Sequence, residues 1–158
     1  MIEVRPAVPD DAPLVATLVG ELLHEIMAAL QEQAFGVNRE ETESRARTWI
    51  ADGRYVVFLA SSGTDRAPAG FLALYESYAL YTEGPYGTIP EFYVRPSSRS
   101  QGVGAALLAE ARRYGGTRNW RRLEVTTPPL PQFDRTFAFY RREGFSISGG
   151  RKMKLELP

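Results

Sequence analysis

The sequence reads Ile89-Pro90-Glu91-Phe92-Tyr93-Val94-Arg95-Pro96-Ser97-Ser98-Arg99-Ser100-Gln101-Gly102-Val103-Gly104 immediately before its most regular helical pattern. Residues 88–94 have the β-branched and aromatic composition of a strand, which Arg95-Pro96 ends. Two glycines one residue apart let the backbone pass close to a ligand at the start of the helix predicted over 103–114. The first N–H groups of a helix lack partners within it and carry the positive end of its dipole. This stretch therefore predicts an anion-binding loop, to which Arg99 adds a positive charge.

Two other phosphate-binding patterns fit this stretch less well. A mononucleotide P-loop would continue with Gly-Lys-Ser/Thr, whereas two alanines follow Gly104. A dinucleotide fingerprint would have a third glycine at position 107, which is Leu107, and its glycines would follow the strand directly. A helix-start turn without any ligand is the remaining alternative.

The rest of the chain alternates strands and helices. Period-two patterns and turn residues predict strands over 2–5, 55–60, 69–78, 88–94, 122–127 and 152–157. Periodic apolar residues and end signals predict helices over 12–30, 39–51, 103–114 and 134–143. This order predicts an α/β fold with a mixed, mostly antiparallel central sheet and helices on both faces, in a single domain over residues 1–158.

The composition excludes several classes of protein and site. The 158 residues are 44% hydrophobic and 24% charged, as in one ordinary globular domain. The most apolar segment, 12–30, carries Glu21, His24 and Glu25, which argues against a membrane span. The N-terminus lacks a signal-peptide pattern, so a cytoplasmic location is expected. The absence of cysteine excludes thiolate catalysis, and a single histidine argues against a triad or a histidine metal centre, so no metal is expected.

The formal charge of zero conceals a division along the sequence. Residues 1–94 hold 6 basic and 14 acidic side chains, a net charge of −8, whereas residues 95–158 hold 13 basic and 5 acidic ones, a net charge of +8. If the fold keeps these surfaces apart, an anionic ligand would prefer the second part and a cationic one the first. Otherwise the two signs neutralise each other across one fold. The arginines of residues 112–122 come without an overall basic balance of the chain, so nucleic-acid binding is not expected.

The loop at residues 99–104 resembles the pyrophosphate loop of the GNAT superfamily of acyl-CoA N-acyltransferases, with Arg99, Gly102 and Gly104 matching its Arg/Gln-x-x-Gly-x-Gly/Ala pattern. A second stretch, Phe139-Tyr140-Arg141-Arg142-Glu143-Gly144-Phe145, resembles the Phe-Tyr helix of that family, which Gly-Phe closes. The opening Val4-Arg5-Pro6-Ala7 with Asp11 adds to a resemblance that covers nearly the whole chain. The resemblance implies the GNAT fold and an acetyl-CoA-dependent N-acetyltransferase, and it also admits a homodimer.

The same resemblance implies the site residues. Backbone N–H groups of the loop would hold the pyrophosphate, and the strand before it would pair with the pantetheine arm of acetyl-CoA. The cofactor-binding residues are then Phe92, Tyr93, Val94, Arg99, Ser100, Gln101, Gly102, Val103, Gly104 and Ala105. Tyr140 occupies the position of the general acid, which protonates the leaving thiolate. The alternative for Tyr140 is an ordinary core aromatic residue.

A carboxylate or an ordered water must take a proton from the acceptor, because an amine is mostly protonated near neutral pH. Glu91 is the first candidate, since it lies on the strand that would touch the acyl group, and Glu76 is the second. A structural ion pair is the alternative for each. His24 is expected on a solvated helix face.

The acceptor itself is only weakly marked. Glu76, Tyr78 and Glu83 resemble the substrate side of diamine and polyamine acetyltransferases, which favours a small cationic amine. Aminoglycosides, amino acids and a protein lysine or N-terminus remain alternatives. Residues 126–133 depart from the family pattern in being several residues longer, with Phe133 where an asparagine is common. A module that binds acyl-CoA without catalysis is the alternative function.

Overall fold

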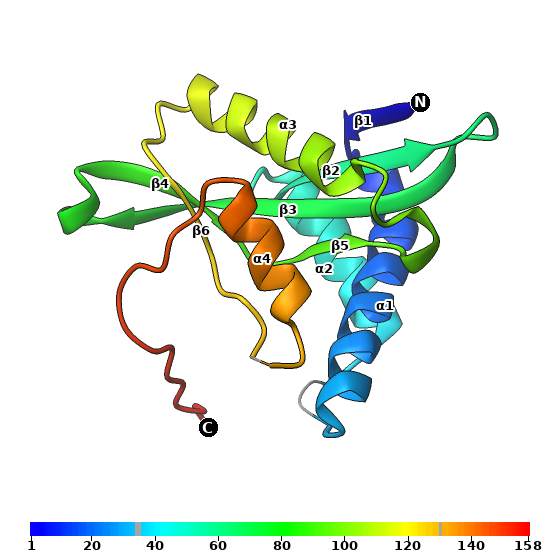
Figure 1. Cartoon of the computed structure of the whole chain (residues 1–158). Coiled ribbons are helices and arrows are strands. Elements are labelled where there is room, and N and C mark those ends of the chain that lie inside the picture. Colours follow the sequence, from blue (N-terminus) through cyan, green and yellow to red (C-terminus); the bar gives the residue numbers. More distant parts are fainter. Residues whose placement is uncertain (34–35, 130) are drawn as a thin grey trace. The chain divides into compact units, whose positions relative to one another are not determined.

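The computed structural model describes residues 1–33, 36–129 and 131–158 (Figure 1). Contacts divide the chain into a first unit, Met1–Thr126, and a second unit, Thr127–Pro158, and the two are described separately. The single domain predicted from the sequence stays a prediction. The regular elements of the first unit are β1 (Ile2–Pro6), α1 (Ala12–Leu30), α2 (Arg39–Ala51), β2 (Val56–Ser62), β3 (Ala67–Ala79), β4 (Gly84–Ile89), β5 (Phe92–Val94), α3 (Val103–Thr117) and β6 (Leu123–Val125).

The strands of the first unit form one mixed sheet in the order β1-β2-β3-β4-β6, with β5 also paired to β3. All of these pairs are antiparallel except β4 with β6, which is parallel. The parallel pair arises because α3 lies between the two strands in the sequence and provides the crossover. The predicted α/β class with a mostly antiparallel sheet is confirmed.

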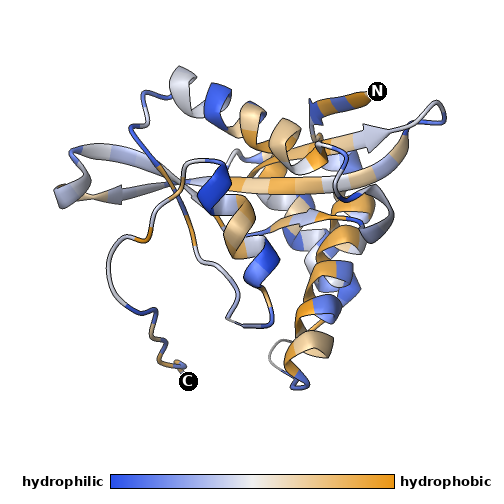
Figure 2. Cartoon of the chain, in the orientation of Figure 1, coloured by the Kyte–Doolittle hydropathy of each residue, from blue (hydrophilic) through white to orange (hydrophobic). Residues whose placement is uncertain are grey.

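Alternate residues of the central strands face different helices. Val57, Leu59, Phe71 and Ala73 pack with buried side chains of α1 and α2 in one core cluster. The residues between them face the opposite side, where α3 contacts β2 and β3 and where Phe58 meets Tyr114 of α3 edge to face. Figure 1 shows α3 on one side of the sheet and α1 and α2 on the other, and Figure 2 shows that the middle of β3 is apolar. A strand buried on both faces explains the nearly continuous apolar run in β3.

Helix α1 uses its apolar stripe in this core. Its length and composition, with the turn before it, would suffice to span a membrane. However, Ala12, Val15 and Leu18 are buried against the sheet residues, while Glu21 and Glu25 lie on the partly exposed side of the helix. This distribution is that of an amphipathic core helix.

The predicted strand over 88–94 is two strands rather than one. β3 pairs with β4 up to Tyr75↔Thr88 and with β5 from Leu72↔Phe92. Two residues of β3, 73 and 74, therefore lie opposite three residues, 89–91, which is the geometry of a β-bulge. Pro90 has no N–H to donate to the ladder, which favours an interruption at this position.

The second unit contains α4 (Asp134–Arg142). Gly144 adopts a φ of 101° after the helix, and the N–H of Phe145 donates to the carbonyl of Tyr140 (2.9 Å), so the predicted Gly-Phe ending is present. The predicted strand over 152–157 is wrong, because these residues form no helix or strand and are exposed. Alternation alone does not make a strand, since its backbone groups need a neighbouring strand as a partner. Leu130, in the proline-rich loop, lies outside the described residues.

Gly70 is the position where the sheet tolerates no side chain. A Cβ at this position would meet the carbonyl oxygen of Tyr93 and lie 3.0 Å from the Cα of Val94. We expect Gly70→Ala to lower the free energy of unfolding by about 2 kcal/mol, because backbone of the neighbouring strand must shift. Gly116→Ala is the control, since its Cβ would enter open space on α3 and should stabilise the helix by up to about 1 kcal/mol. Urea unfolding measures both, and equal effects would contradict the close β3–β5 approach.

Candidate active site

The predicted anion loop joins β5 to α3 through one turn of 3-10 helix, Pro96–Ser98. The chain then turns through left-handed conformations at Ser100 (φ 62°) and Gly102 (φ 89°). Gly102 is the N-cap of α3, and its carbonyl accepts the first helical hydrogen bond, from the N–H of Ala106 (3.0 Å). The N–H groups of the three residues before Ala106 have no partner within the helix. The loop therefore lies at the positive end of a 15-residue helix, which would stabilise an anion bound there.

The loop offers backbone groups rather than side chains. Val103 points into the core and is 1% exposed. The amide of Gln101 donates to the carbonyl of Ser97 (3.2 Å), while Ser100 and Ala105 are exposed and Gly104 is half-buried. Of the cofactor-binding residues predicted in the loop, Val103 has only its backbone available to a ligand, because its side chain is buried. Binding through N–H groups selects for the shape and charge of a phosphate chain.

Arg99 was expected to supply a positive charge to the loop. Its Nε donates to the carbonyl of Val94 (2.9 Å), and its Nη2 donates to both carboxylate oxygens of Glu25 on α1 (2.8 and 2.9 Å). Its guanidinium also lies over the ring of Tyr93, 5.8 Å from the centroid. In this conformation Arg99 holds the loop against β5 and α1, and Glu25 neutralises its charge.

A second pair repeats this arrangement four residues earlier. Arg95 donates from Nε and Nη2 to the carboxylate of Glu21 (3.1 and 2.9 Å), and the hydroxyl of Tyr93 donates to the same carboxylate (3.3 Å). Sequence reasoning missed Glu21 and Glu25 as partners of the site. The signal was present in the equal spacing of the two carboxylates on α1 and the two arginines after β5.

Strand β5 has β3 as its partner on one edge only among the described residues. The last parallel pair of β4 with β6 is Ile89↔Val125, so β5 continues beyond the point where β6 ends. Ala73 donates to the carbonyl of Glu91 (2.9 Å) and Arg95 donates to that of Ala69 (2.8 Å). This register directs the N–H and C=O of Tyr93 toward β3 and those of Phe92 and Val94 toward the other edge. Of the three strand residues predicted to pair with pantetheine, Tyr93 therefore has its backbone engaged in the sheet.

Glu91 lies in the bulge, and its side chain is largely buried on the face that α1 and α2 cover. Burial raises the pKa of Glu91 to about 7, and the hydrogen bond from the hydroxyl of Tyr55 (3.5 Å) partly opposes that rise. Tyr55 also stacks on Tyr75, with centroids 6.1 Å apart, and contacts Trp49 at 5.2 Å. No local motif marks Tyr55, which is 36 residues away from Glu91 in the sequence. A carboxyl group that titrates near neutral pH suits proton transfer.

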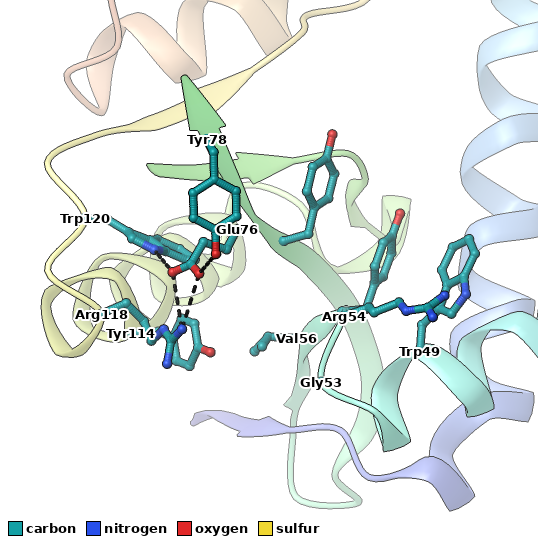
Figure 3. A pocket seen from close by; sticks show the side chains of 11 residues that line it. Trp49, Gly53, Arg54, Val56, Glu76, Tyr78, Tyr114, Arg118 and Trp120 are labelled. Carbon is teal, nitrogen blue, oxygen red and sulfur yellow. Dashed lines mark hydrogen bonds and ion pairs between the residues drawn. The ribbon is translucent and has the colours of Figure 1, made fainter. Parts of the chain in front are cut away.

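Glu76 and Tyr78 lie elsewhere in the first unit, on the α3 side of β3. The carboxylate of Glu76 accepts from Trp120 Nε1 (2.7 Å), from Arg118 Nη2 (3.3 Å) and from the hydroxyl of Tyr78. These hydrogen bonds, that of Tyr78 foremost, lower the pKa of Glu76. Figure 3 shows the three donors gathered around this carboxylate. Glu76 is thus an ionised but fully partnered group, in agreement with the structural ion pair that the sequence left open.

Glu83 has a different partner from this cluster. It ends the 3-10 turn Leu80–Thr82 at the tip of the β3–β4 hairpin, with a φ of 57°. Its carboxylate pairs with Arg121 (3.3 Å), and both side chains are about three-quarters exposed. The three predicted substrate-binding residues therefore divide into Glu76 with Tyr78 and, separately, Glu83.

Tyr140 belongs to the second unit, where it lies on α4 and is 6% exposed. Its ring packs edge to face against Phe139 and Phe145, with centroids 5.6 and 5.3 Å away. Burial raises the pKa of Tyr140 above its ordinary value, so the phenol is protonated at neutral pH. A protonated, positioned phenol meets the chemical requirement of a general acid.

Comparison with known proteins decides the family. The sequence profile of the Acetyltransferase (GNAT) family matches residues 23–145, which include both motifs. The chain belongs to the GNAT acetyltransferase family. Among curated proteins, no sequence matches this chain.

Solved structures agree with this membership at the level of the fold. An integron cassette protein, HFX_CASS3, from the mobile metagenome of Cole Harbour Salt Marsh has a TM-score of 0.78 and 24% identity, over 98% of this chain and 90% of its own. The aminoglycoside acetyltransferase meta-AAC0020 from an uncultured soil sample, in complex with sisomicin, has a TM-score of 0.76 and 16% identity over 99% and 97%. A predicted acetyltransferase from Clostridium acetobutylicum, with acetyl-CoA, has a TM-score of 0.73 and 18% identity over 100% and 96%.

Because it belongs to the GNAT acetyltransferase family, the chain is an acetyl-CoA-dependent N-acetyltransferase. The described residues fit that cosubstrate, because the Gly102 turn and the unpartnered N–H groups at the start of α3 suit a pyrophosphate. The edge of β5 that faces away from β3 suits an extended amide-containing arm.

The raised pKa of Glu91 predicts a pH-dependent effect on stability. A carboxyl group that binds its proton more tightly in the folded state contributes stability below its unfolded pKa and loses it as the pH rises through about 7. Glutamine does not ionise, so Glu91→Gln does not lose stability in this way. The free energy of unfolding of the variant minus that of wild type should therefore be about 2 to 3 kcal/mol larger at pH ~8 than at pH ~4. Urea unfolding at several pH values measures the difference.

Glu76→Gln serves as the matched control, because the pKa of Glu76 is lowered and its trend has the opposite sign. A constant difference between wild type and Glu91→Gln at all pH values would show that Glu91 is not the buried group described above.

Proposed function

We propose that this GNAT acetyltransferase moves an acetyl group from acetyl-CoA to the primary amine of a small cationic acceptor, by direct attack in a ternary complex. Glu91 acts as the base and Tyr140 as the general acid. The observation that carries the proposal is the largely buried carboxyl of Glu91, with a pKa of about 7, in the bulge that directly precedes β5.

The cosubstrate is held mainly by backbone groups in this proposal. The loop from Arg99 to Ala105 binds the pyrophosphate, with Arg99 and Gln101 stabilising its shape. Phe92 and Val94 lie with their backbone toward the pantetheine arm, where Val94 offers its N–H because its carbonyl already accepts from Arg99, while Tyr93 anchors the strand to β3 and α1. Acetyl-CoA supplies an activated thioester carbonyl when bound.

The reaction then needs two proton transfers. The acceptor arrives as an ammonium ion and gives a proton to ionised Glu91, which leaves a nucleophilic amine. The nitrogen forms a bond to the carbonyl carbon, the carbon–sulfur bond breaks, and Tyr140 gives a proton to the departing thiolate. The chain contains no cysteine, which agrees with a direct transfer that forms no acyl-cysteine.

Electrostatics support a cationic acceptor. A largely buried carboxylate attracts a cation strongly and repels an anion. Among the predicted acidic residues, Glu91 carries this argument alone, because Glu76 pairs with Arg118 and Glu83 with Arg121. Polyamines and aminoglycosides both belong to this class of acceptor, and a similar fold occurs in an aminoglycoside acetyltransferase. A cytoplasmic location, where acetyl-CoA is available, completes the proposal.

A rate comparison tests the acceptor and the base together. We measure thiol release from acetyl-CoA with a polyamine, a neutral amino sugar and an acidic amino acid as acceptors. The polyamine should give the highest kcat/KM, and kcat/KM should rise with pH through about 7 as Glu91 ionises. In Glu91→Gln this rise should disappear and the rate should fall by roughly 10- to 1000-fold.

Three results would contradict the proposal. A preference for the acidic amino acid would reject the cationic acceptor, and a Glu91→Gln enzyme with the rate and pH profile of wild type would return Glu91 to a structural role. Calorimetric binding of acetyl-CoA without turnover on any amine would favour the binding module instead.

Tyr140→Phe tests the general acid. The ring packing against Phe139 and Phe145 survives, so acetyl-CoA affinity and Tm should change little, whereas kcat should fall by roughly 10- to 1000-fold. Tyr86→Phe, which removes a phenolic hydroxyl from β4, is the control and should keep its kcat. An unchanged kcat in Tyr140→Phe, with chemistry shown to be rate-limiting, would make Tyr140 a core aromatic residue.

A further inference from the structure

A cavity of about 570 Å³ lies where β2 begins and β3 ends. Its volume is within the range of sites that bind small molecules. Figure 3 shows its labelled side chains in two groups, Trp49 with Arg54 and the residues around Glu76, with Val56 between them. Six of its eleven lining residues are aromatic: Trp49, Tyr55, Tyr75, Tyr78, Tyr114 and Trp120.

Three of these aromatic residues adjoin Glu91. Tyr55 lines the cavity, and its hydroxyl donates to Glu91 (3.5 Å). Trp49, at the end of α2, contacts the ring of Tyr55 with centroids 5.2 Å apart, and Tyr75 stacks on it at 6.1 Å with the planes 17° apart. We call Trp49, Tyr55 and Tyr75 the aromatic wall. It connects the cavity to the carboxyl group that acts as the base in the proposed reaction.

The helices that cover the sheet leave part of the aromatic wall open. Ala73 and Tyr75 lie on the same face of β3, because side chains alternate along a strand. Ala73 packs in the core with residues of α1 and α2 and is 1% exposed, whereas Tyr75 is 36% exposed. A stacked aromatic ring that is open to solvent beside a reactive group is suited to contact a ligand.

The opposite wall of the cavity is held together by its own contacts. The carboxylate of Glu76 accepts from Trp120, from Arg118 and from the hydroxyl of Tyr78. The ring of Trp120 also meets Tyr114 edge to face, with centroids 5.5 Å apart. This wall therefore bounds the cavity, and its carboxylate is already satisfied.

The charges of the cavity do not favour a second ammonium group. Its charged lining residues are Arg54, Glu76 and Arg118. Arg118 pairs with Glu76 (3.3 Å), and Arg54 pairs with Asp52 (3.3 Å). Aromatic rings attract a cation, but a cation here would share the cavity with two guanidinium groups and one carboxylate. A neutral, flat ring has no such conflict and gains from stacking on the aromatic wall.

We propose that the aromatic wall binds the body of the acceptor, and that this acceptor is a primary amine joined by a short carbon chain to a neutral aromatic ring. The inference rests on the proposed function, because the amine must lie at Glu91 for the ring to reach the wall. The chain is short because Tyr55 contacts Glu91 with its hydroxyl and belongs to the wall with its ring. Trp49, Tyr55 and Tyr75 are then the residues that determine specificity for the acceptor.

Acceptors that share a primary amine but differ in the body test this inference in wild type. We measure thiol release from acetyl-CoA with phenethylamine, hexylamine and diaminobutane. Phenethylamine should have a kcat/KM about 10-fold or more above that of diaminobutane, because its ring gains stacking contacts and a second ammonium gains no free carboxylate. Hexylamine, which is apolar but has no ring, should lie between the two.

Tyr75→Ala removes the most exposed ring of the aromatic wall. KM for phenethylamine should rise about 10-fold, whereas KM for diaminobutane and for acetyl-CoA should stay as in wild type. Tyr81→Ala is the matched control, because it removes a ring that is 75% exposed at the tip of the β3–β4 hairpin, outside the cavity lining. It should leave all three acceptors unchanged. If Tyr75→Ala fails to fold by circular dichroism, the comparison of acceptors in wild type decides.

The outcomes separate this inference from the proposed function. Diaminobutane as the best of three acetylated amines would overturn the inference and leave the proposed function intact. An equal loss with every acceptor in Tyr75→Ala would also overturn it, because Tyr75 would then only support Tyr55. With no turnover on any amine the proposed function fails, and calorimetry with phenethyl alcohol, which has the ring without the amine, tests the wall. Binding that Tyr75→Ala weakens would support the wall as a ring site, and no binding to wild type would overturn it.

Discussion

The interruption of the ladder on β3 is the constraint on which the site depends. Three residues, 89–91, face two residues of β3, so the strand that would otherwise continue is divided into β4 and β5. Side chains alternate along a strand, and one extra residue reverses which face each following side chain meets. The bulge therefore places Glu91, Tyr93 and Arg95 on the side of α1 and α2. The bulge also allows β4 to pair in parallel with β6. Beyond it, β5 pairs with β3, and no described strand pairs with its other edge.

Helix α1 stabilises the segment that follows the bulge. Two carboxylates one helical turn apart, Glu21 and Glu25, each accept two hydrogen bonds from an arginine, Arg95 and Arg99. These side chains are about one-third exposed, so each pair contributes about 1 kcal/mol or less to stability. Their larger effect is geometric, because the bidentate Arg95–Glu21 pair and the contact of Arg99 with both oxygens of Glu25 fix the path of the chain between β5 and α3. The positive potential of the loop then comes from the start of α3 rather than from a free guanidinium.

The same pairs change the meaning of the charge division along the sequence. Residues 1–94 carry a net charge of −8 and residues 95–158 one of +8, but the fold joins the two across that boundary. Glu21, Glu25, Glu76 and Glu83 each pair with an arginine from the second part of the chain. The alternative in which the two signs of charge neutralise each other across one fold therefore holds for these four carboxylates. Glu91 is different, because its partner is the neutral hydroxyl of Tyr55 and burial keeps water away from it.

The sequence by itself determined the elements whose signals are local. Leucine spacing marked α1, the glycine spacing marked the turn at the start of α3, and the two motifs identified the family. Glu91 was chosen from its place on the strand, without its environment. Tertiary structure alone decided that environment, since Tyr55 is 36 residues from Glu91 and Trp120 is 44 residues from Glu76. It also divided residues 88–94 into two strands and left residues 152–157 without one. The physical reason is that pairing, burial and pKa depend on neighbours brought together by packing, whereas periodicity and turn chemistry act within a few residues.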